Sequence, residues 1–156
     1  MKKLGKISLY IILGSFIFIQ FLRVDMNTSD EVPVHDLLLV HPEMASDLQQ
    51  TFHTSCYNCH SDNTNYPWYA YIAPFSWVID QHIRNGKHEA NFNGYDTLDK
   101  RQKIGLLDKI CEVVSDSSMP PSNYLMLHPE AVLSEDDIAA ICDWTETEAL
   151  NLLRRK

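Results

Sequence analysis

Residues 54–63 read "TSCYNCHSDN", which places two cysteines three positions apart and a histidine directly after the second. Proteins use such a close cysteine pair to coordinate zinc, to exchange dithiol for disulfide, or to attach haem covalently. Each chemistry requires different residues elsewhere in the chain, so the rest of the sequence discriminates between the three.

A zinc ion would need two further ligands, usually a second pair at short spacing. His82 and His88 have a suitable spacing, but they lie far from the cysteine pair, and Gly86 between them is typical of a helix end. An iron–sulfur cluster would need four thiolates, and the two remaining cysteines are isolated from one another. These spacings disfavour both kinds of site.

Dithiol exchange uses a Cys-x-x-Cys pair at the start of a helix within a βαβ unit, whereas here the pair ends a predicted helix. Covalent haem attachment uses Cys-x-x-Cys-His, and the stretch matches every fixed position of that motif. On a helical turn, Cys56 and Cys59 lie on one face and reach the two vinyl groups along one porphyrin edge. His60 follows on the same side and is placed to bind the iron. We therefore expect one covalently attached haem c.

The second face of the iron needs a ligand or a vacant position. Met119 is the leading candidate, because it stands directly before two prolines in "SDSSMPPSNYLM", residues 115–126. Met126 and His128 are alternatives in the same region, and a methionine that only fills core space is the ordinary interpretation. The other nearby histidines are expected on the wrong side of the motif, in solvent or in hydrogen bonds: His53, His82 and His88.

The periodicity of apolar residues predicts four helices joined by long loops, and therefore an all-α domain. Ser134 supplies an N-cap for the last helix, which begins with acidic residues and ends with basic ones, as the helix dipole favours. The predicted helices cover residues 42–59, 73–86, 97–114 and 134–156.

The loops 60–73 and 115–133 are long for a compact domain, and a large apolar ligand at its centre would explain how they are held. Residues 66–77, "YPWYAYIAPFSW", contain six aromatic side chains and are expected to form part of the wall around the haem. An ordinary aromatic core is the alternative interpretation.

Cys111 and Cys142 each lie on the apolar side of a predicted helix. In an oxidising compartment we expect a disulfide between them, and two separately buried thiols are the alternative.

Residues 1–23 combine a lysine-rich start with an apolar run over 7–22, which is typical of an export signal or a membrane helix. We expect an uncleaved anchor in the inner membrane with the domain on the periplasmic side, and the alternative is a signal peptide that is removed. Residues 24–40 then form an acidic tether, and residues 41–156 form the haem-binding domain.

The exported part is strongly acidic. Four of the 13 Lys and Arg residues precede residue 24, whereas all 21 Asp and Glu residues follow it. Nucleic-acid binding is therefore not expected, since it depends on neutralising phosphates. The charge suits a redox partner with a basic patch, or it only keeps the domain soluble.

Two runs of the chain resemble the small bacterial haem-binding domain family, which is cytochrome-c-like with a single haem. They are "SCYNCHSDNTNYPWYAYIAPFSWVIDQHI" at 55–83 and "MPPSNYLMLHPEAVLSEDDIAAICDW" at 119–144. The resemblance spans roughly residues 34–145 and implies thioethers from Cys56 and Cys59, with His60 and Met119 as iron ligands. Residues 87–105 match less clearly, and nothing functional is carried over there.

With both axial positions occupied, the iron changes oxidation state without binding substrate, so we expect an electron carrier rather than an enzyme. A haem peroxidase would need an open sixth position and a distal acid–base group, for which His128 and His82 are the candidates. A haem-based sensor would need a weak sixth ligand, and an accessory subunit would need only a docking face.

Overall fold

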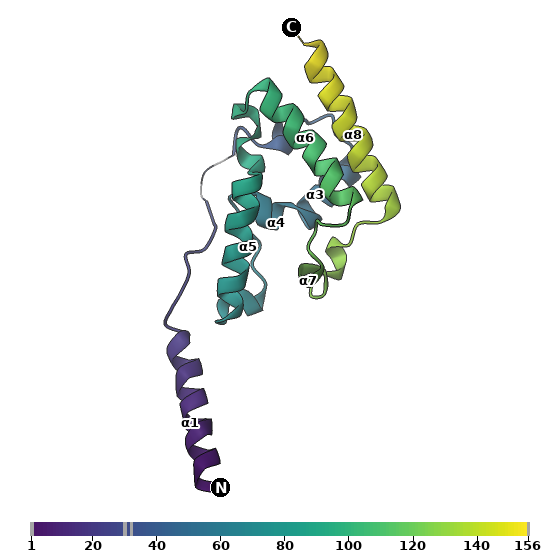
Figure 1. Ribbon diagram of the computed structural model, residues 1–156. Helices are drawn as coiled ribbons and strands as arrows, with labels where there is room; N and C mark the ends of the chain where they lie inside the picture. Colours follow the sequence, from purple (N-terminus) through teal and green to yellow (C-terminus); the bar gives the residue numbers. More distant parts are fainter. Residues whose placement is uncertain (1, 30, 32, 156) are drawn as a thin grey trace.

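A computed structural model describes residues 2–29, 31 and 33–155, and all the regular secondary structure in these residues is helical. Helix α1 (Lys2–Ile19) stands apart from the other helices, which form one body (Figure 1). The predicted all-α class is confirmed. Met1 of the predicted anchor, residues 30 and 32 of the predicted tether and Lys156 of the last predicted helix lie outside the described residues.

Four longer helices occupy the body, and each overlaps one of the predicted ranges. They are α3 (Ser46–Ser55), α5 (Phe75–Glu89), α6 (Lys100–Ser115) and α8 (Glu135–Arg154). Helices α6 and α8 pack along one another and make the most extensive helix–helix contact of the described chain (Figure 1). Short helices fill the connecting segments: α2 (Leu37–Val40), α4 (Tyr57–His60), η1 (Trp68–Tyr71), η2 (Phe92–Thr97), α7 (Ser122–Leu125) and η3 (Pro129–Ala131).

Side-chain caps determine where the last two long helices begin. Asp99 and Gln102 form a capping box, so α6 begins at Lys100 rather than at residue 97. The predicted Ser134 cap of α8 is confirmed, because its hydroxyl accepts the Asp137 N–H. The Asp137 carboxylate in turn accepts the Ser134 N–H at 2.9 Å, which satisfies a second donor.

Two predicted helix features are wrong. The helix expected over 42–59 is divided, because Cys56, with φ −124°, separates α3 from α4. The cysteine pair therefore does not continue the apolar face of α3. Gly86 does not end α5, which continues to Glu89, and the glycine instead allows α5 to pack closely against Cys59.

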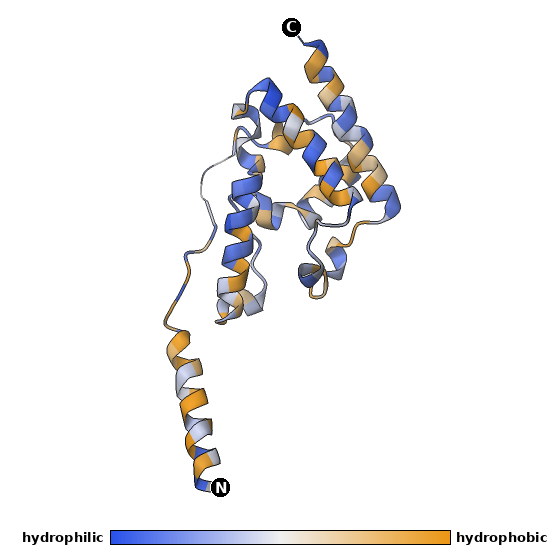
Figure 2. Cartoon of the chain, viewed as in Figure 1, coloured by the Kyte–Doolittle hydropathy of each residue, from blue (hydrophilic) through white to orange (hydrophobic). Residues whose placement is uncertain are grey.

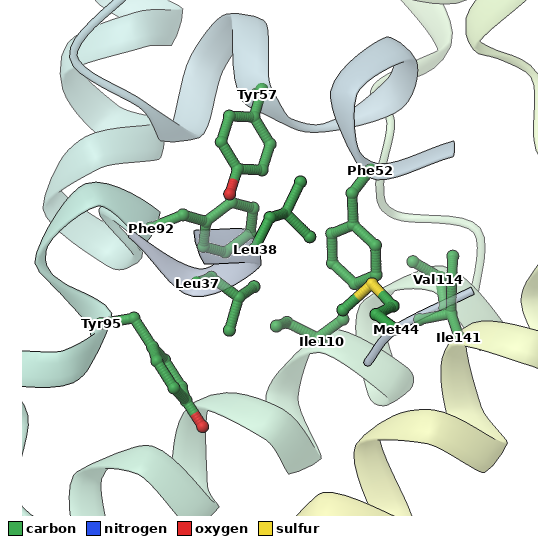
Figure 3. Packing of buried hydrophobic residues seen from close by; sticks show 10 residues of the cluster. All are labelled: Leu37, Leu38, Met44, Phe52, Tyr57, Phe92, Tyr95, Ile110, Val114 and Ile141. Carbon is green, nitrogen blue, oxygen red and sulfur yellow. The ribbon is translucent and has the colours of Figure 1, made fainter. Parts of the chain in front are cut away.

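The core is built around Phe52, whose ring meets the Phe92 ring edge-on with centroids 6.1 Å apart (Figure 3). The Trp144 ring also meets Phe52 edge-on, at 5.8 Å. Leu37 and Leu38 of α2 pack into the same cluster. These two leucines belong to the last part of the segment predicted as a tether, and burying each contributes about 1.5–3 kcal/mol. Packing therefore begins before residue 41.

The Asp36 carboxylate joins three elements of the core. It caps α2 by accepting the Leu38 N–H at 2.9 Å, and it accepts the Tyr57 hydroxyl of α4 at 2.9 Å. It also accepts the Asn93 side-chain amide of η2 at 2.6 Å. With so many donors the buried carboxylate is satisfied, and it holds α4 in a defined place against α2 and η2.

The predicted membrane helix over residues 7–22 is not found. Among the described residues, no helix is both long enough and apolar enough to cross a membrane. Helix α1 starts at Lys2 and ends at Ile19, so its first turns contain three lysines. The last three residues of the apolar run 7–22 lie beyond the end of the helix. Its remaining surface is largely apolar (Figure 2).

A disulfide joins Cys111 of α6 to Cys142 of α8, as predicted. The bridge closes a loop of 31 residues and ties together the two helices that pack most extensively.

The double variant Cys111→Ser with Cys142→Ser is expected to lose about 3–4 kcal/mol of unfolding free energy, because its unfolded chain is no longer cross-linked. Urea unfolding monitored by circular dichroism measures this loss. Dithiothreitol should lower the urea midpoint of the unmodified chain to that of the variant, and it should leave the midpoint of the variant unchanged. Equal midpoints without reductant would contradict the prediction.

Candidate functional site

A cavity of about 700 Å³ lies between α4, α6, the segment that follows α5 and the loop that leads into α7. Cys56, Cys59 and His60 line it together with Met119 and Tyr124. Its volume lies in the range of cofactor pockets. The lining supplied by α6 and by the segment just before it is mainly apolar: Leu98, Leu106, Ile110, Val113 and Val114.

The His60 imidazole is held in one orientation. Its Nδ1 donates to the Ala90 carbonyl at 2.9 Å, and its ring stacks on Phe92 with centroids 5.3 Å apart. With the proton on Nδ1, Nε2 carries the lone pair that a metal ion requires. Burial lowers the pKa of His60, although hydrogen bonds to the Ala90 and Gly86 carbonyls act in the opposite direction. Burial thus favours the neutral, metal-binding form.

The two cysteines of the motif are free thiols in partly buried positions. Burial raises the pKa of Cys56 to about 12, with a further contribution from Cys59, and burial raises the pKa of Cys59 to about 11. Dithiol exchange depends on a thiolate with a lowered pKa. These surroundings therefore disfavour the redox-exchange alternative.

Gly86 of α5 permits the close approach of α5 to the motif. A Cβ atom at this position would lie 2.9 Å from the Cys59 carbonyl oxygen and 3.2 Å from the Cys59 Cβ. The Gly86 carbonyl also accepts the Ala90 N–H at 2.8 Å, which closes the end of α5. One glycine therefore determines both the separation of α4 from α5 and the position of the carbonyl that orients His60.

Met119 is brought into the same cavity as the motif, although it is 59 residues away from His60 in the chain. Its N–H donates to the Val113 carbonyl at 3.0 Å, which fastens the loop to the last turn of α6. Ser117, with a positive φ of 60°, reverses the chain between them. The Met119 side chain is 37% exposed, so it lies at the rim of the cavity.

The other candidates for the second axial position are exposed or engaged in hydrogen bonds. Met126 is 82% exposed and does not line the cavity. Both His128 nitrogens are engaged, Nε2 with the Tyr69 hydroxyl at 2.5 Å and Nδ1 with Glu130 at 2.8 Å. His88 lines the cavity, but 86% of its side chain is exposed.

The remaining histidines do not join the motif. His53 is exposed and packs against Tyr57 at 4.7 Å, outside the cavity. His82 does not line the cavity either. Among the described residues, no group suited to a metal ion combines these histidines with the cysteine pair, so the zinc alternative gains no support.

The aromatic wall predicted from residues 66–77 is wrong. None of these residues lines the cavity, and Trp68, Tyr71 and Phe75 are more than half exposed. Trp68 and Tyr71 are exposed on the short helix η1, and Phe75 is exposed at the start of α5. The aromatic lining comes instead from Phe92 and Tyr124.

Ala90 and Phe92 are the functional residues that the sequence did not indicate. They lie in the stretch 87–105, where the resemblance was least clear. A backbone carbonyl leaves no signature in a sequence, and a single phenylalanine is indistinguishable from core. Ile110 and Val114 of α6 line the cavity and also belong to the core.

A family model described as a haem-binding domain matches residues 14–147, which is most of the chain. No curated protein and no solved structure matches the chain significantly. The matched range contains the cysteine–histidine motif, Gly86, the segment with Ala90 and the Met119 loop.

Gly86→Ala is expected to destabilise the chain by about 1–3 kcal/mol and to lower its haem content, because the added methyl group forces α5 away from Cys59. The urea midpoint and the ratio of haem to protein absorbance measure the two effects. Gly14→Ala on α1 is the control, since a Cβ there has nothing within 4 Å and the residue does not line the cavity. It should be neutral or stabilise by up to about 1 kcal/mol. Equal behaviour of the two variants would refute the packing argument.

Proposed function

Because the chain belongs to the haem-binding domain family, we propose that it carries one haem, attached covalently through Cys56 and Cys59, and acts in electron transfer. The observation that carries this proposal is one cavity that is lined by both thiols, by His60 and by Met119. Haem, when bound, supplies an iron that changes its oxidation state by one electron.

The residues around the cavity fit such a group. The two thiols are the acceptors that thioether attachment requires, and His60 presents a lone pair on Nε2 because Nδ1 is engaged with Ala90. The apolar side chains of α6 exclude water from the cavity and provide the surroundings that a porphyrin face needs. A cavity of about 700 Å³ has room for a cofactor of this size.

Met119 supports a carrier rather than an enzyme. A thioether ligand raises the reduction potential relative to a second imidazole, and two protein ligands leave no open position for a substrate. His128 and His82, the distal groups considered for a peroxidase, do not line the cavity. His128 is moreover engaged at both nitrogens by Tyr69 and Glu130.

The proposed setting is the periplasmic side of the inner membrane, where haem is attached to exported chains. The disulfide between Cys111 and Cys142 supports this setting, since such bridges persist in oxidising compartments. The lysine-rich and apolar segment 1–23 supports export. An acidic surface is suited to steer the domain toward a redox partner with a basic patch.

Optical spectroscopy of the oxidised, haem-loaded chain tests the axial ligands. We expect a low-spin spectrum with the weak red-end band of methionine bound to ferric iron. Met119→Ala should lose this band and lower the reduction potential, whereas Met126→Ala, an exposed methionine of the same region, should retain both. His60→Ala should prevent a stable haem complex.

Two results would contradict the proposal. A high-spin spectrum with rapid peroxide turnover in the unmodified protein would favour an enzyme. The second test uses chain that is co-expressed with the haem maturation machinery and then denatured. If this chain shows no peroxidase-stainable haem and only the mass of the bare polypeptide, covalent attachment is excluded.

A further inference from the structure

The tripeptide His-Pro-Glu occurs twice, at 41–43 and at 128–130. Both copies form the same local pair, because Nδ1 of His41 lies 2.9 Å from Glu43 and Nδ1 of His128 lies 2.8 Å from Glu130. The copies differ at the other ring nitrogen. His128 Nε2 meets the Tyr69 hydroxyl, a contact that has no counterpart in the first copy.

His41 is 6% exposed, and its Nε2 has no hydrogen-bond partner within the described chain. Tyr95 and Trp144 meet its ring edge-on at 5.6 and 5.4 Å, so the imidazole is fixed by packing. A buried ring nitrogen without a partner costs free energy, and an unpaired group of this kind in a well-packed place indicates an additional ligand.

Glu148 of α8 is a second unpaired group beside it. The residue is 4% exposed, and its Oε1 has no hydrogen-bond partner in the described residues. Its Oε2 has only a long contact, 3.3 Å, from the Asn151 amide. Burying an ionised carboxylate costs several kcal/mol unless a cation or strong donors compensate it.

We propose that His41, Glu43 and Glu148 form a binding site for Zn²⁺ or a similar first-row divalent ion. One ligand atom from each residue lies within 4.8 Å of those of the other two. One imidazole nitrogen with two carboxylate oxygens suits such an ion, whereas Mg²⁺ and Ca²⁺ prefer oxygen ligands alone. The two carboxylates also balance the charge of the ion.

The three ligand atoms must move closer together to coordinate one ion, and the site allows this movement. Ligand atoms around a tetrahedral zinc ion stand roughly 3.3 Å apart, given bonds of about 2.0–2.1 Å. The Glu43 side chain is 65% exposed, so it can leave its contact with Nδ1 of His41 and move toward an ion on Nε2, whereas His41 and Glu148 are fixed by burial. The exposed side of Glu43 also provides an entry path for the ion, and it leaves the fourth coordination position of the ion to water.

Arg155 competes with the ion for this site. Its guanidinium lies 4.0 Å from Glu148 Oε1, and 70% of its side chain is exposed. Arg155 also lowers the pKa of Glu43, after larger effects from hydrogen bonds to the Glu43 backbone and to His41, so its charge acts on both carboxylates. A divalent ion would displace this exposed side chain.

The site is separate from the haem cavity, because none of the three ligands lines it. A bound ion would link the turn before α3 to the C-terminal half of α8, two segments far apart in the chain. It would thereby stabilise the folded state, as any ligand does that binds only the folded chain.

Calorimetric titration of the EDTA-treated, haem-loaded full chain with zinc chloride tests the proposal. We expect one zinc ion per chain and a rise in Tm of roughly 5–10 °C at a free zinc concentration about 100 times Kd. Zinc-edge X-ray absorption should show nitrogen and oxygen neighbours without sulfur, which distinguishes this site from unreacted Cys56 and Cys59.

Glu43→Gln should weaken zinc binding at least tenfold without disturbing the fold, since Glu43 is exposed, and Glu148→Gln should abolish it. Glu130→Gln, the equivalent change in the second His-Pro-Glu copy, should leave zinc affinity unchanged. Arg155→Gln should tighten binding several-fold. The haem spectrum should be the same in all four variants. Failure of the zinc proposal is therefore distinguishable from failure of the haem proposal.

The proposal is overturned if the unmodified chain binds no zinc, if Glu43→Gln and Glu148→Gln bind it as tightly as the unmodified chain, or if sulfur appears among the zinc neighbours.

Discussion

The site depends on the close approach of α5 to α4 at Gly86. With hydrogen in place of a side chain, the backbone of α5 lies against the Cys59 carbonyl, where a Cβ would stand only 2.9 Å away. The Gly86 carbonyl accepts the Ala90 N–H at the end of α5, and the Ala90 carbonyl then accepts the Nδ1 proton of His60. The separation of the helices and the orientation of the imidazole thus share one cause, because both follow from the course of the backbone between residues 86 and 90.

A second set of contacts holds α4 from the other side. The buried Asp36 carboxylate accepts hydrogen bonds from α2, from Tyr57 and from Asn93, so the helical turn that carries the motif is fixed against the core rather than suspended in a loop. Phe92 connects these contacts to the site, since its ring packs against both Phe52 in the core and His60 in the cavity. Rigid support of this kind is what a metal-binding imidazole needs to keep its orientation.

The two long connecting segments have different roles. The segment after α6 is fastened to Val113 and delivers Met119 to the cavity, whereas the aromatic segment before α5 exposes three of its rings and supports the fold through contacts such as that of Tyr69 with His128. The disulfide joins α6 to α8, and the apolar side of α6 contributes both to the core and to the cavity. Ile110 and Val114 belong to both environments, so the core is continuous with the proposed haem pocket.

The sequence by itself determined the helical class, the Ser134 cap, the disulfide pair and the candidate motif, because periodicity, capping and cysteine spacing are local or compositional signals. Only the tertiary structure decided that Cys56 separates two helices, that Gly86 serves packing rather than helix termination, and that Ala90 and Phe92 rather than residues 66–77 surround His60. It also brought His41 beside Glu148, although 107 positions separate them in the chain. These features arise from contacts between distant segments and from backbone atoms, neither of which leaves a pattern along one chain.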